Sequence, residues 1–393
     1  MIVLGAVGLA TVLIGVDATV DLHVVERWPL LFGACAAGSR GLLTAVASSM
    51  ITVAAVVFSI TIVALSLMSS QYTSRILRNF MRDRNNQVVL GVFLGIFAYC
   101  LVVLRVIRSG DEGAFVPSLS VLVGLILAFV GIGYLIFFIH YISVSIQSSS
   151  IIAAAAHETI AAVDQLFPQG MGDDVEEDAD GDLAMALLEQ AWFAVPARKT
   201  GYIQNIDGDS LLVAARELGT IVRMECGIGE FVVEGTPLIS VAHPAGLDEE
   251  TADALNAVYV ISPHRTVEQD ASFGIRQLVD IALKALSPGI NDTTTAVMCV
   301  NYLAAILARL ASRPIATVRR LDRGELRVIA RGPCFESLLA EAFDQIRQNA
   351  EGNVAVLTRQ LQSLEIIASQ TANTQRRQSL RQQAILIAAV LAA

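Results

Sequence analysis

Apolar residues form four runs in the first part of the chain, about 2–16, 45–68, 88–104 and 119–146. The second run holds no ionisable side chain, and about twenty apolar residues suffice to cross a bilayer as one helix. The pattern therefore predicts an α-helical polytopic membrane domain of about four spans over residues 1–146.

The second run carries hydroxyl side chains on one helical face. Their steps of four, seven, seven and four residues keep them in line along a helix. The members are Ser48, Thr52, Ser59, Ser66 and Ser70, with Ala55 and Ile62 between them. Three interpretations stay open: packing between helices, a pore lining in which hydroxyls replace hydration, and a signalling helix that shifts as a piston or rotor.

Basic side chains follow this run directly, at Arg75, Arg78, Arg82 and Arg84. Apolar residues among them predict an amphipathic, interfacial elbow at the lipid headgroups, although a simple positive-inside anchor also explains the charge. The next outer loop is acidic, and arginine-rich loops stay in the cytoplasm. We therefore expect a multi-pass protein of the cell inner membrane whose C-terminal half is cytoplasmic.

Residues 147–190 are predicted to connect the membrane part to a soluble part. The fourth span is expected to continue as a helix through Ser143–Phe167, which would couple the two parts rigidly. Seven acidic residues then lie between Asp173 and Asp182. They are typical of a solvated linker. A loose divalent-cation site is the alternative, although Leu183 stands where an EF-hand loop requires glycine.

Residues 191–245 have the periodicity of short strands separated by glycine turns. The predicted strands are GYIQNID, LLVAA, GTIVRME and GEFVVEGTPLISV. The closing stretch resembles half of a lipoyl-like barrel-sandwich domain, which implies a small β barrel-like module. No lysine stands at the matching hairpin tip, so we expect no covalently attached cofactor.

Residues 246–393 predict a helical cytoplasmic domain, which makes the soluble half α+β. A helical hairpin begins it: the first helix is stopped by Pro288 and Gly289, and the second runs to about Ala311. The residues of interest in this hairpin are Arg276, Asp280, Ser287, Asn291 and Asp292. We expect Arg276 and Asp280 on a solvated face and a cap at Asn291 or Asp292; an anion or subunit contact at the turn is the alternative.

A strand at 326–330 and three helices are predicted to close the chain as a helical bundle. The helices are Phe335–Asn349, Val354–Ser369 and Gln375–Ala392. The last ends in the apolar sequence AILIAAVLAA, which is short for a further span, so we expect it to pack on the domain.

Charge divides the chain. The 393 residues carry a formal net charge of −10, and most of the negative charge lies after residue 150. An acidic soluble part argues against nucleic acid as a partner. The five cysteines and five histidines show no metal-ligand spacing, and no phosphate-binding loop occurs. We therefore expect no metal, no cofactor and no enzymatic activity.

Two blocks carry a family resemblance: SSMITVAAVVFSITIVALSLMSSQYTSRILRNFMRD and QDASFGIRQLVDIALKALSPGINDTTTA. They are similar to the signature blocks of a bacterial family of predicted membrane proteins, catalogued as domain of unknown function twenty-two fifty-four. The resemblance implies an integral membrane protein with a cytoplasmic C-terminal half. It implies no activity and no catalytic residues.

The pattern favours a homo-oligomeric channel or pore that conducts a small ion among membrane lipid and is assembled or gated by its cytoplasmic domain. One chain offers a single polar-striped helix, and symmetric repetition would supply the others. The alternative is a membrane-anchored sensor or scaffold without transport activity. An enzyme acting on a membrane substrate ranks lowest.

Overall fold

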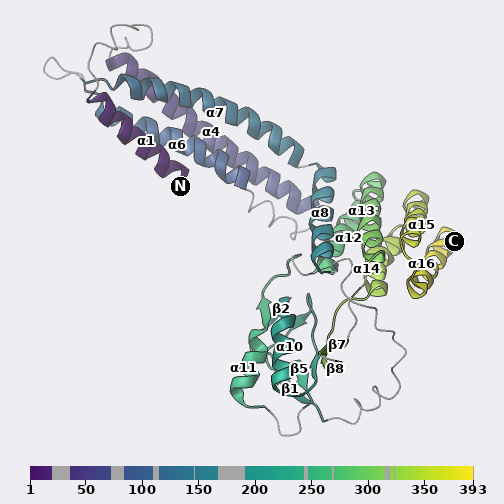
Figure 1. The fold of residues 1–393 in the computed structure, drawn as a ribbon. Helices are drawn as coiled ribbons and strands as arrows, with labels where there is room; N and C mark the ends of the chain where they lie inside the picture. The colour runs from purple at the N-terminus through teal and green to yellow at the C-terminus, as the bar shows by residue number, and fades with distance from the viewer. Residues whose placement is uncertain are drawn as a thin grey trace. The chain divides into compact units, whose positions relative to one another are not determined.

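The structure, a computed structural model, describes residues 1–19, 36–71, 84–108, 115–145, 147–166, 191–242, 247–267, 270–313, 315, 319–322 and 324–392. It divides into two compact units, Met1–Gln147 and Ser148–Ala393 (Figure 1).

Four described helices build the first unit: α1 (Ile2–Asp17), α4 (Ala36–Gln71), α6 (Arg84–Val106) and α7 (Ser118–Ser145). Helix α6 packs against each of the other three. Its side chains Phe93 and Tyr99 are completely buried. Helix α6 is therefore the centre of this unit. Large apolar side chains such as Phe58 of α4 and Phe129 of α7 remain exposed, which suits contact with lipid.

Glycines let these helices approach closely. A Cβ atom at Gly91 would lie 3.1 Å from Ile2 Cδ1, and one at Gly95 would lie 3.4 Å from Ala6 Cβ. A Cβ atom at Gly124 of α7 would lie 2.9 Å from Leu43 Cδ2 of α4. Small residues at four-residue spacing are the usual means by which membrane helices pack, and α1 uses such a surface on α6.

Four described helices are long and apolar enough to cross a membrane. Three of them, α4, α6 and α7, are in the first unit and correspond to predicted spans. The fourth is α13 (Thr293–Ala311), more than half of whose apolar window is buried within the protein. The predicted first span is α1, which has 16 residues. At 1.5 Å per residue it is about 24 Å long, shorter than a bilayer core of about 30 Å.

The predicted continuous helix through Ser143–Phe167 is interrupted. Helix α7 ends at Ser145, and α8 (Ser148–Leu166) begins after a bend at Gln147. The Gln147 N–H donates to the Val144 carbonyl at 3.2 Å, which is a three-residue turn. Serines follow at 148–150, and their hydroxyls compete with the helical backbone hydrogen bonds. The expectation of a rigid rod from the fourth span was therefore wrong.

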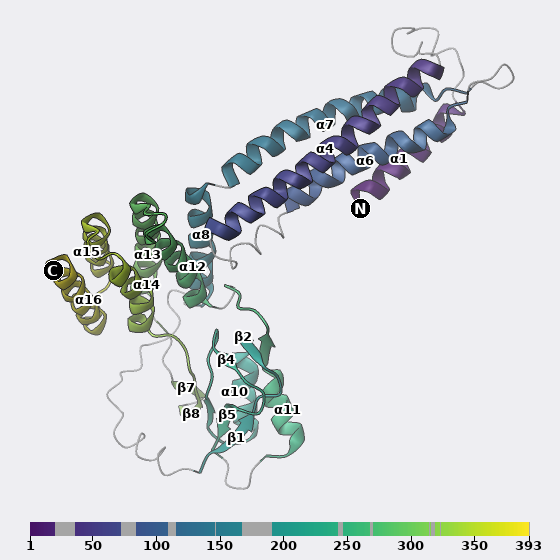
Figure 2. The same cartoon turned by 180° about the vertical axis from the view of Figure 1, so that it is seen from behind.

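The second unit contains a row of helices. They are α8, α12 (Ala271–Leu286), α13, α14 (Phe335–Asn349), α15 (Val354–Ser369) and α16 (Thr374–Ala392). Helix α8 packs on α12 and α13, these pack on α14 and α15, and α16 covers α14 and α15 at the far edge (Figures 1 and 2). The predicted bounds of α14 and α15 are confirmed.

Two open sheets complete the second unit. The larger has the order β1 (Phe193–Pro196), β5 (Pro237–Val241), β3 (Val222–Met224), β8 (Glu325–Ile329) and β7 (Arg319–Asp322). The smaller has the order β4 (Phe231–Val232), β2 (Gly201–Ile206) and β6 (Tyr259–Ser262). The predicted barrel-like module was wrong, because neither sheet closes on itself in the described part of the chain.

Helices replace barrel strands in this region. The segment LLVAA, predicted as a strand, lies in α10 (Gly208–Glu217), and α11 (Glu249–Ala257) was not predicted. Asp207 accepts a hydrogen bond from the Ser210 N–H at 3.1 Å and so caps the N-terminus of α10. This N-cap favours a helix over the strand that the apolar run LLVAA had indicated. Leu211 of α10 and Leu255 of α11 share one core with Val222 and Ile239 of the larger sheet.

Candidate functional site

Helix α4 has one face that packs inside its own unit. The buried side chains follow one another at steps of four, three, four, three and seven residues, the spacing of helices that cross at small angles. They are Leu43, Ala47, Met50, Ala54, Val57 and Ala64. This face meets α6 and α7.

The predicted hydroxyl stripe lies on another face of the same helix. Ser48, Thr52, Ser59 and Ser66 are all exposed, as is Ala55. At 100° per residue, the centre of the stripe is roughly 150° from the centre of the packed face. The stripe is therefore directed away from the helices of its own unit. Packing between helices of one subunit does not account for it.

The hydroxyl groups near the start of the stripe bond back to their own helix. Ser48 Oγ donates to the Thr44 carbonyl, and Thr52 Oγ1 donates to the Ser48 carbonyl at 2.7 Å. Their hydrogens are thereby engaged, so the oxygen lone pairs are what these groups present outward. Such a surface can accept hydrogen bonds from water or contact a cation.

The rest of this predicted region is described only in part. The backbone of Ser70 lies in α4, but its side chain is outside the described residues. Arg75, Arg78 and Arg82 are outside them as well. Arg84 is the first residue of α6 and is exposed. The dipole of α6 does not stabilise a positive charge at the N-terminus of the helix. The position of Arg84 is therefore not explained by helix capping.

Asp17, the last residue of α1, forms a polar contact at one end of the first unit. Its carboxylate accepts hydrogen bonds at 2.9 Å from the backbone N–H groups of Leu119 and Ser120, at the start of α7. The Ser120 hydroxyl also donates to it, at 2.6 Å. The buried Tyr99 hydroxyl donates to the Ser120 carbonyl at 2.8 Å. This carboxylate joins the end of α1 to a helix N-terminus, which favours negative charge.

The hairpin turn between α12 and α13 is held by local bonds. Asp292 accepts from the Thr295 N–H at 3.0 Å and from the Thr295 hydroxyl at 2.6 Å, so Asp292 is the N-cap. Asn291 has a positive φ of 49°, which asparagine tolerates. Ser287 Oγ donates to the Lys284 carbonyl at 2.7 Å. An anion at this helix start would have to displace a carboxylate that already occupies the N–H of Thr295.

Arg276 and Asp280 form the expected ion pair on α12, at 2.8 Å. Their side chains are only 26% and 13% exposed, because α14 packs along this helix. The expectation of a solvated face for this pair was therefore wrong. Gln277, next to Arg276, is buried too.

A polar cluster that sequence reasoning missed links α12 to α14. Ser272 Oγ donates to Glu341 Oε2 at 2.6 Å, and Arg265 contacts Asp270 at 2.7 Å. Burial raises the pKa of the Glu341 carboxyl above its ordinary value, despite the Ser272 hydrogen bond and the nearby Arg265 guanidinium. Only tertiary packing brings these residues together, so spacing along the chain carried no signal for Glu341.

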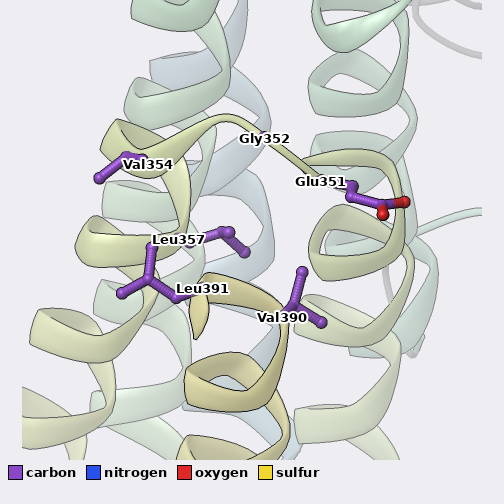
Figure 3. Close-up of a pocket in the computed structure, with 6 residues that line it drawn as sticks. All are labelled: Glu351, Gly352, Val354, Leu357, Val390 and Leu391. Atoms are coloured by element: carbon purple, nitrogen blue, oxygen red, sulfur yellow. The ribbon is translucent and has the colours of Figure 1, made fainter. Parts of the chain in front are cut away.

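Two pockets in the described part of the second unit lie beside α16. One of about 250 Å³ lies between the α14–α15 turn and the end of α16 (Figure 3). It is lined by Glu351, Gly352, Val354, Leu357, Val390 and Leu391. Its lining holds a single titratable group, which offers no acid–base pair for catalysis. Within the described residues, no group of three His, Cys, Asp or Glu side chains is placed to hold a metal ion.

Comparisons with known proteins place the chain in a family. A family described as "Predicted membrane protein (DUF2254)" matches residues 1–366. The chain is 36% identical over 367 residues to "Uncharacterized protein Rv1290c" of Mycobacterium tuberculosis and to "Uncharacterized protein Mb1321c" of Mycobacterium bovis. Each alignment covers 91% of this chain and 69% of the relative. No solved structure matches. The family resemblance is thus confirmed, and the chain belongs to the DUF2254 family of predicted membrane proteins.

Proposed function

We propose that this chain is one subunit of a homo-oligomeric channel or pore for a small ion, assembled or gated by its second unit. The observation that carries the proposal is the exposed stripe of Ser48, Thr52, Ser59 and Ser66 on α4. Ser48 and Thr52 donate their hydroxyl hydrogens to their own helix, so their oxygen lone pairs are the groups left without a donor. Hydrocarbon cannot supply that donor and water can, so an exposed row of such oxygens favours an aqueous path over lipid contact.

Rotational symmetry in a homo-oligomer could supply the further polar helices that one chain lacks. A water-filled path needs polar surface on all sides, and the first unit offers one striped helix. A ring of subunits related by rotation would place one copy of α4 after another around a common axis. The stripes would then face the axis, while exposed apolar side chains such as Val56 and Phe58 would face lipid or neighbouring subunits.

The proposed setting is the bacterial inner membrane, with the second unit in the cytoplasm. The support is the arginine content of the segment between α4 and α6, because basic loops are retained on the cytoplasmic side. Membrane lipid and further copies of the chain are the proposed partners. The proposed function involves no nucleic acid partner, no cofactor and no enzymatic activity.

Conductance of the purified protein in planar bilayers tests the proposal. Ser59→Leu places a bulky apolar group in the middle of the stripe, and we expect conductance to fall by tenfold or more through narrowing or dewetting. Ser48→Leu and Ser49→Leu form a matched pair. Both residues are exposed serines, but they lie about 100° apart on the helix, so only the first is expected to reduce conductance.

Potassium and chloride gradients would identify the charge of the permeant ion. A wild-type protein that stays electrically silent as an assembled oligomer would overturn the pore and leave the sensor or scaffold. Equal losses in Ser48→Leu and Ser49→Leu would show that the stripe is not the lining. Val57 cannot serve as a neutral control, because it is buried against its own unit.

A further inference from the structure

Arg376, in the first turn of α16, contacts the end of another helix. Its Nη1 atom donates to the carbonyl groups of Ala311 at 3.0 Å and Arg313 at 2.9 Å, with Leu310 at 3.5 Å. These carbonyls lie at the C-terminal end of α13, where the last carbonyl groups of a helix need hydrogen-bond donors beyond the helical ladder. The Leu310 carbonyl also accepts the Arg313 N–H at 3.1 Å, so Ala311 and Arg313 carry the main contact with Arg376. The guanidinium thus caps α13, where positive charge is favoured by the helix dipole.

The same end of α13 caps a third helix. The Arg313 side chain is 4% exposed, and its Nη1 donates to the carbonyls of Val163 and Asp164, at 3.3 and 3.1 Å. Its Nη2 lies 2.6 Å from Asp164 Oδ1. Arg309 adds a second pair to the same carboxylate, at 2.8 Å. The residues at the end of α8 are therefore held by two arginines of α13.

Helix α8 is seated tightly at its middle as well. A Cβ atom at Gly274 of α12 would lie 2.0 Å from Thr159 Oγ1, so the two helices touch through the glycine. Thr159 is fully buried. Helix α8 is therefore held at two places, at its middle by Gly274 of α12 and at its end by Arg313.

Helix α16 is attached far less firmly than the helices it covers. Its buried side chains are Leu380, Gln383 and Ile387, one of which is polar. Larger apolar groups stay exposed on it, including Ile385 at 63% and Leu391 at 37%. A helix with little buried apolar surface opens at lower free energy than the core around it.

We propose that α16 is a releasable clamp: through Arg376 and then Arg313, its docking fixes the end of α8, the helix that directly follows the first unit in sequence. Release of α16 removes the Arg376 hydrogen bonds to the carbonyls of Ala311 and Arg313 and so loosens the segment that carries Arg313. The end of α8 then loosens. Helix α16 itself packs on α14 and α15, so this effect would reach α8 through Arg376 and Arg313. This device does not depend on whether the first unit conducts ions.

Hydrogen exchange of the full chain in lipid nanodiscs tests the clamp. In Arg376→Ala we expect amides of residues 159–166 in α8 to exchange at least tenfold faster, because a charge-assisted cap on α13 is lost. Arg381→Ala is the matched control, since Arg381 is an exposed arginine of the same helix. It should leave α8 unchanged. Arg376→Lys keeps the positive charge and should give a smaller increase.

A double-mutant comparison distinguishes the proposed clamp from a general destabilisation of the second unit. Arg376→Ala and Asp164→Asn should be strongly non-additive in the exchange rate of α8, because both act on one chain of contacts. Faster exchange confined to α16 in Arg376→Ala would overturn the proposal. Equal acceleration of α8 in Arg381→Ala would also overturn it, since the effect would then not pass through Arg376.

Discussion

Glu341 is a carboxyl whose properties are set by burial in the second unit. It lies on α14 and receives a hydrogen bond from Ser272 on α12. Burial is the largest influence on its pKa and raises it above the ordinary value of 4.5, while the charges of Arg265 and Arg276 act in the opposite direction. The ionised form is therefore the less favourable one in the folded protein.

This carboxyl should make stability depend on pH. A raised folded-state pKa contributes stability that is complete below pH 4.5 and is lost as the pH rises through the folded pKa. Glu341→Gln removes the charge and keeps an acceptor for Ser272, so we expect a higher melting temperature than wild type at pH 7. The gain should shrink as the pH falls to 4.5.

Thermal unfolding of the detergent-solubilised chain across this pH range is the measurement. Glu351→Gln is the control, because Glu351 is exposed at the α14–α15 turn. It should change the melting temperature little at any pH. A melting temperature of Glu341→Gln below wild type at pH 7 would mean that attraction to the charges of Arg265 and Arg276 outweighs the cost of burial.

At the scale of single elements, aspartate begins several helices of the second unit. In each case the carboxylate accepts from the backbone N–H three residues later. The caps are Asp207 of α10, Asp248 of α11, Asp270 of α12 and Asp292 of α13. The hydrogen bonds lower the pKa values of Asp207, Asp248 and Asp292. These caps place helix starts where apolar periodicity alone is ambiguous.

Removing the α13 cap tests one such element. Asp292→Ala should destabilise the second unit by about 1 kcal/mol, the usual cost of a lost N-cap. Asn291→Gly, one residue earlier, should be neutral or slightly stabilising, because the positive φ of Asn291 suits glycine. Chemical unfolding followed by tryptophan fluorescence would measure both. Equal destabilisation by both changes would assign the effect to the turn as a whole.

Anion binding at the turn between α12 and α13 can be tested by a thermal shift. Inorganic phosphate should not raise the melting temperature of wild type, since Asp292 already occupies the start of α13. A rise in wild type that becomes larger in Asp292→Asn, which removes the competing negative charge, would instead support an anion site at residues 287–292.

At the scale of the whole molecule, the orientation of the two units across the membrane is the main expectation to test. Arginines gather between α4 and α6, whereas Asp111 and Glu112 lie between α6 and α7. In a variant without native cysteines, a cysteine at Glu112 should react with an impermeant thiol reagent in intact cells. A cysteine at Asn85 should not, until the cells are opened.

The outcome of this labelling bears on the second unit as well. Protection of the Asn85 position places the C-terminal half in the cytoplasm if α7 crosses the membrane. The reverse pattern would put that half outside the cell and contradict the inner-membrane orientation proposed above.

Sequence alone determined the features that depend on local pattern. The three long apolar helices of the first unit, a hairpin cap at Asn291 or Asp292 and the bounds of α14 and α15 follow from hydrophobic periodicity and end signals that act within a few residues. The structure then assigned the cap to Asp292. The family was identifiable from two continuous blocks for the same reason, because continuous sequence carries such signatures.

Tertiary structure decided what depends on contacts between distant residues. The larger sheet joins β3 to β8, about a hundred residues later in the chain, and no local pattern specifies that partner. The arginine contacts from α16 through α13 to α8, and the burial of Glu341, arise only when helices distant in sequence pack together. The hydroxyl stripe that includes Ser59 was visible in the sequence. Only the packing of α4 in the structure showed that the stripe is directed away from the other helices of its own unit.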